Sequence, residues 1–485
     1  MDGRWRFPFR HGAWGNGELK NTADIVVIGG GPAGVATALE ASKNGASVLL
    51  LEADTLIGGN AARSTGYLAF QGFEMQDKEG FEDSAEIFYA DMVEEINRQK
   101  ENYGIEFDTE LAKIFAQESA STYDWLIDLG FEFNRFLPRP LQHSVNRMVD
   151  VTDTSMFTKV FSDVLEKNDV DIRTSTRARR LLVDKSVIVG VQAENETFRA
   201  NLGVVLAAGG YQANSSLRKK YQPENMASTP YLGTQYDVGD GHVMGQEVGG
   251  ELINMTMIPP LIMVGSALVE DSIAVNALGS RFHDEAGPYD YRVKELNNQP
   301  GRSAYYIYDN QTYMKKMQLI NEMPETPSTA NSLIELAEII GSDPKGLDSE
   351  IARWNDFLAS SEEKDPEFGR VILPAGRRGI LEPPYYASRM ITGINFPAGG
   401  FRVNADLQVL NVYGEPIPKL FAVGDCSGGL GPVIGMGGMR ITPALTLGRV
   451  AGRKIATQNF ECSPNPERLD SCIPSNEMKV PVIDD

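Results

Sequence analysis

Three glycines and one acidic residue are spaced to bind a phosphate-containing ligand. Gly29, Gly31 and Gly34 follow the apolar run 25–28 in the spacing G-x-G-x-x-G, and Glu52 lies about twenty residues further on. In this arrangement the first glycine permits a tight turn, the second lets backbone N–H groups approach a pyrophosphate, and the third lets a helix pack closely on the strand. The acidic side chain then accepts hydrogen bonds from a ribose. The stretch therefore predicts a dinucleotide site.

A second glycine-rich stretch lies towards the end of the chain, over residues 428–438. The residues after it predict a helix over 441–455, with Thr442 and Pro443 in its first turn. The N–H groups at a helix N-terminus attract anions and stabilise developing oxyanions. This loop is therefore a candidate anion or oxyanion site.

A parallel sheet is needed to bring these two stretches together. We expect strands over 25–28, 47–51, 204–208 and 420–425, and a small β-meander over 175–210. We expect helices over 33–44, 84–130, 239–248, 331–340, 344–360 and 441–455. The first long helical stretch begins with Ser84 as its N-cap. Strands that alternate with helices in this way predict an α/β fold.

The length of 485 residues favours two domains over one. Between residues 251 and 393 the sequence becomes rich in prolines and aromatic residues, and after this segment the strand and helix pattern of the first part returns. We therefore predict a discontinuous nucleotide-binding domain made of residues 1–250 and 394–485, with a cap domain, residues 251–393, inserted into it.

The overall composition excludes several classes of partner. The 45 basic and 66 acidic residues give a formal net charge of −21, which disfavours nucleic acids and anionic membranes. The first 21 residues have no apolar core of the kind a secretory signal needs, so we expect a cytoplasmic protein whose N-terminal arm lies over the folded body. The three cysteines, Cys426, Cys462 and Cys472, show no metal-binding or redox spacing, and we predict no metal site.

Further motifs spread over nearly the whole chain identify a family. They are GGGPAG with Glu52, GGN at 58–60, LAAGGY at 206–211, GDG at 239–241, VNALGSRFHDE at 275–285, FGR at 368–370, PPYYA at 383–387 and AVGD at 422–425. In order and spacing the chain resembles the flavoproteins that include fumarate reductases and 3-ketosteroid dehydrogenases. The resemblance implies a Rossmann-like FAD-binding domain of the glutathione-reductase type with an inserted α+β cap domain that completes the catalytic site. The sequence has one dinucleotide fingerprint, which fits FAD without a second nicotinamide cofactor.

The fingerprint and the resemblance together give the residues expected to contact FAD. They are Gly29, Gly31, Pro32, Ala33, Gly34, Glu52, Ala53, Gly59, Asn60, Ser64, Thr65, Gly66, Ala178, Ala208, Gly209, Asp240, Gly424, Asp425, Arg440, Thr442, Pro443 and Ala444. Asp240 opens a predicted helix, so a plain helix N-terminus is an equal reading of its motif. Small residues over 58–67 would let the backbone pass close to a flat ring system. Since this segment has no histidine or cysteine, we expect the FAD to be bound non-covalently.

The residues expected around the substrate distinguish two branches of the family. Where fumarate reductases typically carry a proton-donating arginine, this chain has Tyr289, and Pro259, Gly431 and Gly435 stand near the places of their dicarboxylate ligands. Fumarate and succinate are therefore not the expected substrates. The run ending in Tyr289 resembles the ketosteroid dehydrogenases instead. In those enzymes a tyrosine abstracts a proton beside a ring ketone, and flavin N5 accepts hydride from the neighbouring carbon.

The resemblance assigns roles to further residues of the same branch. The backbone N–H of Gly438 is the match for the donor that holds the ketone oxygen, and Tyr289 is the expected base, with a simple aromatic lining residue as the alternative. A second tyrosine of those enzymes aligns with Ile434, and Tyr67 is a candidate to replace it. His283 could tune Tyr289 or serve only a structural role.

Arg440 lies just past Gly438, and its role has three readings. It could bind a substrate carboxylate bidentately, form a salt bridge with the cap, or neutralise charge near the reduced flavin. The first reading fits a small cyclic keto acid such as 4-oxocyclohexanecarboxylate. An apolar run could instead line a wider steroid cleft or serve as core: Met255, Met257, Ile258, Leu261, Ile262 and Met263.

We therefore predict an FAD-dependent oxidoreductase that acts on CH–CH donors and desaturates a cyclic ketone, with oxygen or another molecule as electron acceptor. One alternative is the reverse activity, an ene-reductase of the fumarate reductase type that reduces an activated double bond. Another is a flavin-binding protein without catalysis. The sequence has no C-x-x-C-H haem-attachment motif, which favours the oxidative direction.

Overall fold

A computed structural model describes residues 21–457, except residues 104, 139–141, 195, 223, 258–260, 264–267, 322, 324 and 434. The largest sheet has the strand order β18-β19-β9-β1-β2-β6, and β8 joins β9 to β7. Its strands are β1 (Thr22–Ile28), β2 (Val48–Leu51), β6 (Asp171–Arg173), β7 (Ala178–Asp184), β8 (Val187–Ala193), β9 (Thr197–Leu206), β18 (Gln408–Leu410) and β19 (Pro416–Ala422). Its five central strands run parallel, as predicted for an α/β fold.

The predicted meander over 175–210 is confirmed. β7 pairs antiparallel with β8, and β8 pairs antiparallel with β9, which then returns beside β1 in the main sheet. The strand β1 is buried on both faces along Ile25–Ile28 because parallel strands occupy both of its edges and helices cover it.

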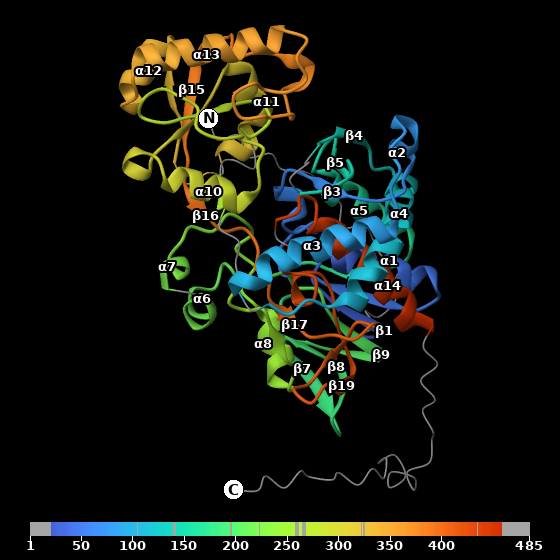
Figure 1. Cartoon of the computed structure of the whole chain (residues 1–485). Coiled ribbons are helices and arrows are strands. Elements are labelled where there is room, and N and C mark those ends of the chain that lie inside the picture. The colour runs from blue at the N-terminus through green and yellow to red at the C-terminus, as the bar shows by residue number, and fades with distance from the viewer. Residues whose placement is uncertain are drawn as a thin grey trace, which may run out of the picture.

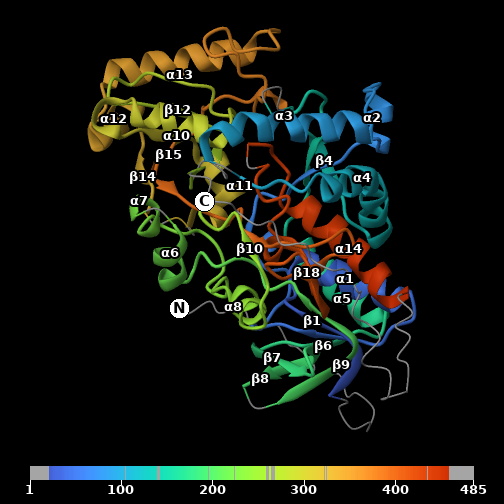
Figure 2. The same ribbon diagram turned by 60° about the horizontal axis from the view of Figure 1, so that its bottom comes forward.

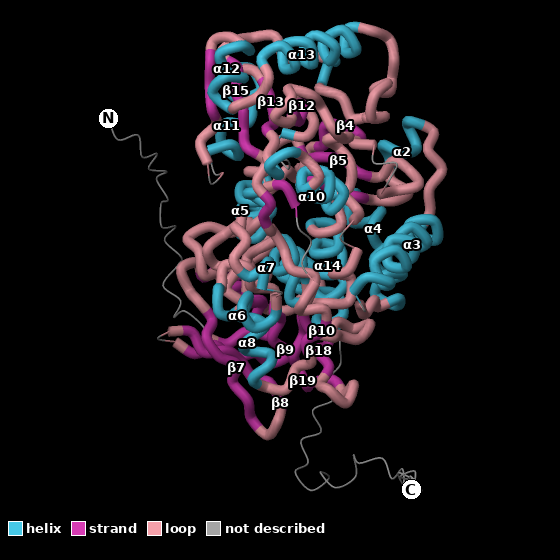
Figure 3. Tube along the Cα trace, turned by 60° about the vertical axis from the view of Figure 1, so that its left-hand side comes forward, coloured by secondary structure: helices cyan, strands magenta, loops and turns pink. Residues whose placement is uncertain are grey.

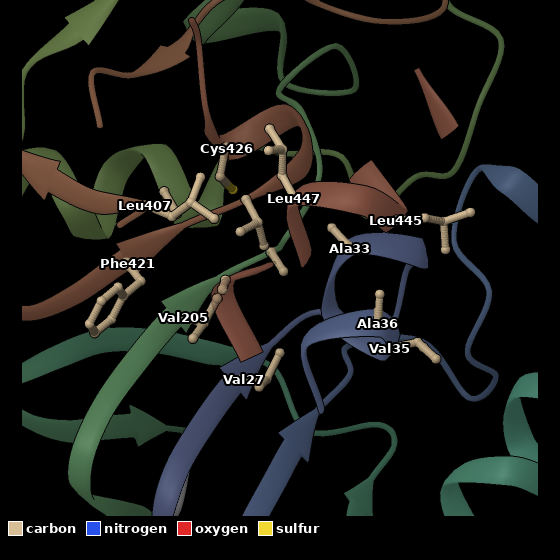
Figure 4. Close-up of a cluster of buried hydrophobic side chains, with 14 of the residues drawn as sticks. Val27, Ala33, Val35, Ala36, Val205, Leu407, Phe421, Cys426, Leu445 and Leu447 are labelled. Atoms are coloured by element: carbon tan, nitrogen blue, oxygen red, sulfur yellow. The ribbon is translucent and has the colours of Figure 1, made fainter. Parts of the chain in front are cut away.

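Two helices far apart in the sequence pack side by side on this sheet. They are α1 (Pro32–Lys43) and α14 (Ile441–Thr457), shown together in Figure 1 and Figure 2. A Cβ atom at Gly448 would lie 2.5 Å from the carbonyl oxygen of Ala33, so only glycine permits this spacing. Figure 4 shows the core beneath them, where Val27, Val205 and Phe421 come from neighbouring strands and Ala36 and Leu445 from the two helices.

A further group of helices and strands packs against α14 through α4 and β3. It contains the helices α2 (Glu74–Glu79), α3 (Ala85–Tyr103), α4 (Thr109–Leu129) and α5 (Met156–Lys167), and a sheet of β3 (Tyr67–Ala69), β5 (Met148–Val151) and β4 (Phe133–Phe136). The helical pattern predicted over 84–130 is formed by two helices, α3 and α4. Asp108 begins the second helix by accepting hydrogen bonds from the N–H groups of Glu110 and Leu111.

The segment between residues 251 and 393 forms its own sheet and its own hydrophobic clusters. The sheet has the order β12-β13-β15-β14, all antiparallel. Its strands are β12 (Ile273–Val275), β13 (Tyr305–Tyr308), β14 (Ser328–Ala330) and β15 (Tyr385–Arg389), and its helices are α10 (Tyr289–Asn297), α11 (Asn310–Asn321), α12 (Leu333–Ile340) and α13 (Pro344–Ala359). Figure 3 shows this part above the large sheet, and we call it the cap.

Shorter elements connect the cap to the rest of the chain. Near the two ends of the cap segment, β11 (Leu261–Ile262) pairs antiparallel with β16 (Thr392–Gly393). β10 (Leu252–Ile253) likewise pairs antiparallel with β17 (Gly400–Phe401). The helices α6 (Ser215–Tyr221), α7 (Glu224–Ala227) and α8 (Asp240–Glu247) precede this connection.

Several sequence predictions can be placed on this fold. Cys426 is buried, whereas Cys462, Cys472 and the N-terminal arm lie outside the described residues. In the described helices we find no segment that is both long and apolar enough to cross a bilayer. The same residues contain no cluster of three or more side chains able to hold a metal ion.

The contact between α1 and β1 generates a stability prediction. A Cβ atom at Gly34 would lie 1.9 Å from the carbonyl oxygen of Gly29, so Gly34→Ala must push the helix away from the strand. We expect the free energy of unfolding of the FAD-free protein to fall by about 3 kcal/mol. Urea denaturation followed by circular dichroism measures this change.

Gly31→Ala is the matched control, because no atom lies within 4 Å of a Cβ atom at that position. Its stability should stay within about 1 kcal/mol of the unsubstituted protein. Equal stability of the two variants would contradict the close packing of α1 on β1.

Candidate functional site

One cavity of about 1390 Å³ runs between the large sheet and the cap. Its wall includes the carboxyl ends of β1, β2 and β9 and the N-terminus of α1. It also includes Tyr67, Tyr289, Gly438 and Arg440. Of the predicted cofactor residues, the following line its wall: Gly29, Gly31, Pro32, Ala33, Glu52, Ala53, Gly59, Asn60, Ser64, Thr65, Ala178, Ala208, Gly209, Asp240, Gly424, Asp425, Arg440 and Ala444.

The turn between β1 and α1 is built to receive a pyrophosphate. Gly29 has φ +110°, and a Cβ atom there would lie 2.2 Å from the carbonyl oxygen of Ala207. Gly31 is the N-cap of α1 and faces open cavity space, so a ligand can approach its N–H group and the helix N-terminus. Glu52 accepts hydrogen bonds from the N–H groups of Gly30 (2.6 Å) and Asp54 (2.7 Å), and burial raises the pKa of its carboxyl.

Four predicted cofactor residues lie behind the wall and have structural contacts there. Gly34 packs on β1, as described above, and Gly66 has φ +71° beside Val151. Thr442 is buried and accepts a hydrogen bond from the N–H of Ala69 (2.9 Å), which connects the start of α14 to β3. Pro443 is also buried in the first turn of α14.

A buried carboxylate that sequence reasoning missed supports the middle of the cavity. Asp237 accepts hydrogen bonds from Asn60 (2.6 Å) and from the hydroxyl of Tyr231 (2.7 Å). Burial raises the pKa of Asp237 to about 7. No motif marks this residue, since its role depends on Asn60 arriving from 177 positions earlier in the chain. Asp240, by contrast, is paired with Arg177, with Nε–Oδ2 2.6 Å and Nη2–Oδ1 2.7 Å.

The loop before α14 provides a backbone donor on the wall of the cavity. Gly438 has φ +77°, and a Cβ atom there would lie 2.6 Å from the N atom of Ala69. The neighbouring Gly437 donates its N–H to Gln142 (2.8 Å), and its carbonyl oxygen contacts Nε2 of His143 (2.9 Å). The structure gives the N–H of Gly438 no hydrogen bond to any residue that it describes. This N–H is therefore available to a ligand in the cavity.

Arg440 is a half-buried cation on the same wall. Its Nη2 donates to the carbonyl oxygen of Gly431 (2.7 Å), and its guanidinium lies 4.2 Å from the ring centroid of Phe396. Burial lowers the pKa of Arg440 to about 10, and the negative charge of Asp425 opposes this shift, so the side chain remains charged at pH 7. Phe396 and Met436, which sequence reasoning did not single out, line the cavity beside it.

Tyr289 reaches the cavity from the first turn of α10. The motif residues before it form a buried ion cluster that fixes this position. Glu285 accepts two hydrogen bonds from Arg281 (2.9 and 2.8 Å) and one from Arg370 (3.0 Å). These arginines hold the pKa of Glu285 well below its usual range. His283 stacks on Phe282 at 4.4 Å, and burial lowers its pKa to about 4, so it is neutral at pH 7.

Tyr67 lies on the cavity wall and also on the border of the cap. Its hydroxyl donates to Glu270, which pairs with Arg135 at 3.5 Å. Of the predicted apolar run, Leu261 lines the cavity, while Met255, Met257, Ile262 and Met263 are buried and absent from its wall. Ile258, Pro259 and Ile434 lie outside the described residues.

The two glycines near the positions of the dicarboxylate ligands have no space for side chains. A Cβ atom at Gly431 would lie 1.6 Å from the carbonyl oxygen of Ala398, and one at Gly435 would lie 2.2 Å from Oε1 of Glu95. Gly435 instead donates its N–H to that same carboxylate oxygen at 2.9 Å. Neither glycine lines the cavity, and Arg440 is the charged residue of this loop that does.

Comparison with known proteins identifies close relatives over most of the chain. The family model of the FAD binding domain matches residues 24–441. The fumarate reductase (cytochrome) of Shewanella frigidimarina is 30% identical over 459 residues, which cover 90% of this chain and 77% of that protein. The urocanate reductase of Eggerthella lenta is 29% identical over 475 residues, which cover 90% of this chain and 75% of that protein.

The chain is also similar to a solved structure of a ketosteroid dehydrogenase. The 3-ketosteroid-Δ4-(5α)-dehydrogenase from Rhodococcus jostii RHA1, in complex with 4-androstene-3,17-dione, superposes with a TM-score of 0.64 and 26% identity. The match covers 90% of this chain and 97% of that one. The family match indicates FAD as the cofactor.

The N-terminus of α1 generates a binding prediction. In Gly31→Ala the added methyl group points into the cavity rather than into the protein. We expect the Kd for FAD to rise at least tenfold, about 1.4 kcal/mol, while the FAD-free protein remains folded. Fluorescence titration of the FAD-free protein measures the Kd, and unchanged affinity would place the pyrophosphate away from this turn.

Proposed function

The chain belongs to the FAD-binding domain family, and from this premise we propose that it is a dehydrogenase that introduces a C=C bond α,β to the ketone of a cyclic substrate. Membership makes it an FAD-dependent oxidoreductase acting on CH–CH bonds. The predicted family, the α/β FAD-binding fold and the FAD cofactor are confirmed. One observation carries the finer proposal: a tyrosine from the cap, Tyr289, and the backbone N–H of Gly438, which has no partner among the described residues, line the same cavity.

The residues of this chain fit FAD without adjustment. The cavity is large and continuous, its β1–α1 turn offers N–H groups to phosphates, and Glu52 lies where a ribose is held. When bound, FAD supplies the acceptor for the hydride that leaves the β-carbon of the substrate.

The remaining chemistry is supplied by the protein. The N–H of Gly438 would donate a hydrogen bond to the ketone oxygen and stabilise the negative charge that develops there as the α-proton leaves. The phenolic oxygen of Tyr289 would accept that proton. Loss of one proton from the α-carbon and one hydride from the β-carbon leaves the C=C bond. Tyr67, whose hydroxyl contacts Glu270, is the proposed second phenol of the site.

Arg440 supports a keto acid as the substrate. Its guanidinium remains charged, lines the cavity and donates through Nη2 to the carbonyl oxygen of Gly431, which leaves its other N–H groups for a ligand. A guanidinium binds a carboxylate through two parallel hydrogen bonds. We therefore propose 4-oxocyclohexanecarboxylate or a similar small cyclic keto acid as the substrate, with a saturated 3-ketosteroid as the second candidate. Oxygen or another soluble molecule is the proposed electron acceptor.

A second candidate function is the reverse reaction. The relatives with 29–30% identity are named reductases, which favours an enzyme that reduces an activated double bond. In that direction Tyr289 would donate the proton that it otherwise accepts. The supply of electrons would then decide the direction, since both reactions use the same groups.

Anaerobic flavin absorbance separates these proposals. The oxidised enzyme is mixed separately with 4-oxocyclohexanecarboxylate, a saturated 3-ketosteroid and succinate. We expect bleaching by the keto acid. Bleaching by the steroid alone would contradict the role of Arg440, and bleaching by neither ketone, together with reoxidation of the reduced enzyme by an enone, would favour the reductase.

The proposed base gives the next prediction. In Tyr289→Phe we expect the rate of flavin reduction by the ketone to fall at least about 100-fold, because the proton acceptor is lost. FAD content should not change, since Tyr289 comes from α10 of the cap and is not part of the β1–α1 turn. Stopped-flow absorbance measures the rate. Tyr291→Phe, on the same helix, is the control, and an equal loss in both variants would contradict the assignment.

The proposed carboxylate ligand gives a separate prediction. In Arg440→Gln we expect the KM for the keto acid to rise about 10–100-fold through loss of a charge-assisted pair. The rate with a neutral ketone should change much less. Steady-state kinetics with both substrates measures this, with Arg389→Gln, an exposed arginine of the cap, as the control. Loss of FAD from the Arg440 variant would assign the residue to the cofactor instead.

A further inference from the structure

Arg292 lies against Tyr289 with a charge that its surroundings do not neutralise. It follows Tyr289 by one turn of α10, and its guanidinium carbon lies 4.9 Å from the centroid of the Tyr289 ring. Only 4% of Arg292 is exposed. Its Nε and Nη1 atoms have no hydrogen-bond partner among the residues that the structure describes. A buried arginine without a carboxylate partner is costly, and such groups occur where the charge has a function.

The buried ion cluster next to Arg292 does not supply the missing negative charge. Arg281 pairs with Glu285 and with Asp365 at 3.1 Å, and Arg370 pairs with Glu285 at 3.0 Å. Glu350, which accepts a hydrogen bond from the N–H of Arg281, is itself paired with Arg353. Four guanidinium groups, that of Arg292 included, thus face three carboxylates. His283 is neutral because burial lowers its pKa to about 4, and the nearby positive charges contribute to that shift. One positive charge therefore remains uncompensated beside Tyr289.

The other charged groups around Tyr289 do not reverse this balance. Arg440, from the loop before α14, interacts electrostatically with Tyr289. Asp425 partly compensates the charge of Arg440, and Glu270 is paired with Arg135. Tyr289 therefore lies near two positive charges, and that of Arg292 is paired with no carboxylate in the described part of the chain.

A small cavity brings this charge to the reacting end of the site. It has a volume of about 10 Å³ and is lined by Arg292, Tyr289 and Tyr67, together with Gln142, Val269, Ala286 and Gly287. Arg292 does not line the large cavity, so it would not touch the substrate. Its charge would instead act on the reaction through Tyr289, whose ring it faces. The hydroxyl of Tyr306, a buried neutral group, also lies beside the guanidinium.

We propose that Arg292 is the positioning residue of the catalytic base: its buried, uncompensated guanidinium holds the Tyr289 ring and favours the anionic phenolate that abstracts the α-proton. This proposal rests on the proposed ketone desaturation. It explains how a phenol acts as a base without a carboxylate or histidine beside it, since a nearby cation lowers the energy of the phenolate in a buried site. His283 is not needed as a partner, because its ring stacks on Phe282 and it is neutral.

The test removes the charge of Arg292 and follows the pH dependence of the reaction. In Arg292→Gln we expect the midpoint of the pH profile of flavin reduction to move up by at least about one pH unit, and the rate at pH 7 to fall about tenfold. Arg292→Lys keeps the charge and should restore most of the shift. Lys294→Gln, an exposed residue of the same helix, removes an equal charge and should leave the midpoint in place. A rate that falls equally at all pH values in Arg292→Gln, with the midpoint unchanged, would overturn the proposal.

A measurement without substrate separates this proposal from the proposed function. The near-ultraviolet tyrosinate band of the FAD-loaded enzyme is titrated with base, and the contribution of Tyr289 is the part that Tyr289→Phe removes. We expect this part to appear at lower pH in the unsubstituted enzyme than in Arg292→Gln. If no ketone bleaches the flavin but this shift is present, the desaturase proposal fails, whereas the effect of Arg292 on the Tyr289 phenolate is supported. If the band titrates identically in both proteins, the role of Arg292 is refuted. Arg292→Lys provides the same comparison if the Gln variant does not fold.

Discussion

The contact between Gly34 and the carbonyl oxygen of Gly29 is the constraint on which the rest of the site depends. With only hydrogen at position 34, α1 starts directly from the end of β1, and its N-terminus points along the carboxyl edge of the sheet. The helix α14 then packs on α1 through another glycine, Gly448. This second contact places the loop that ends at Arg440 beside the same cavity. The close contacts at Gly34 and Gly448 therefore position both the β1–α1 turn and the loop before α14 beside the cavity.

The reacting end needs a second support, because Tyr289 comes from the cap. That support is electrostatic: Glu285 is fully buried between Arg281 and Arg370, immediately before the turn that presents Tyr289. Burying such ions is expensive, and removing one partner would leave an unpaired charge in the interior, so the cluster has essentially one stable arrangement. The cluster fixes the start of α10, and Arg292 is the member of the group whose charge is directed at the tyrosine itself.

The parts of the site that were predictable from sequence are those that local chemistry specifies. The strand, glycines, helix and acid over 24–52 allow one arrangement, and Gly438 is marked by the glycine loop and the following helix. Asp237 and Arg292 were not predictable, because each acts through a residue that the fold alone brings close. The break between α3 and α4 was missed for a related reason: the apolar pattern continues across it, and the capping hydrogen bonds of Asp108 decide the boundary.

The groups proposed to carry out the reaction differ from the group proposed to select the substrate. In the proposed desaturation the oxyanion donor would be a backbone N–H and the base would be positioned by the ion cluster of the cap, so neither would depend on the shape of the substrate beyond its ketone. Selection of the substrate would fall to Arg440, since the loop has no space for side chains at Gly431 and Gly435. Because Tyr289 and Gly438 come from different parts of the chain, their separation depends on how the cap sits. Glu270 of the cap, in contact with both Tyr67 and Arg135, holds the two parts together at the edge of the cavity where the base acts.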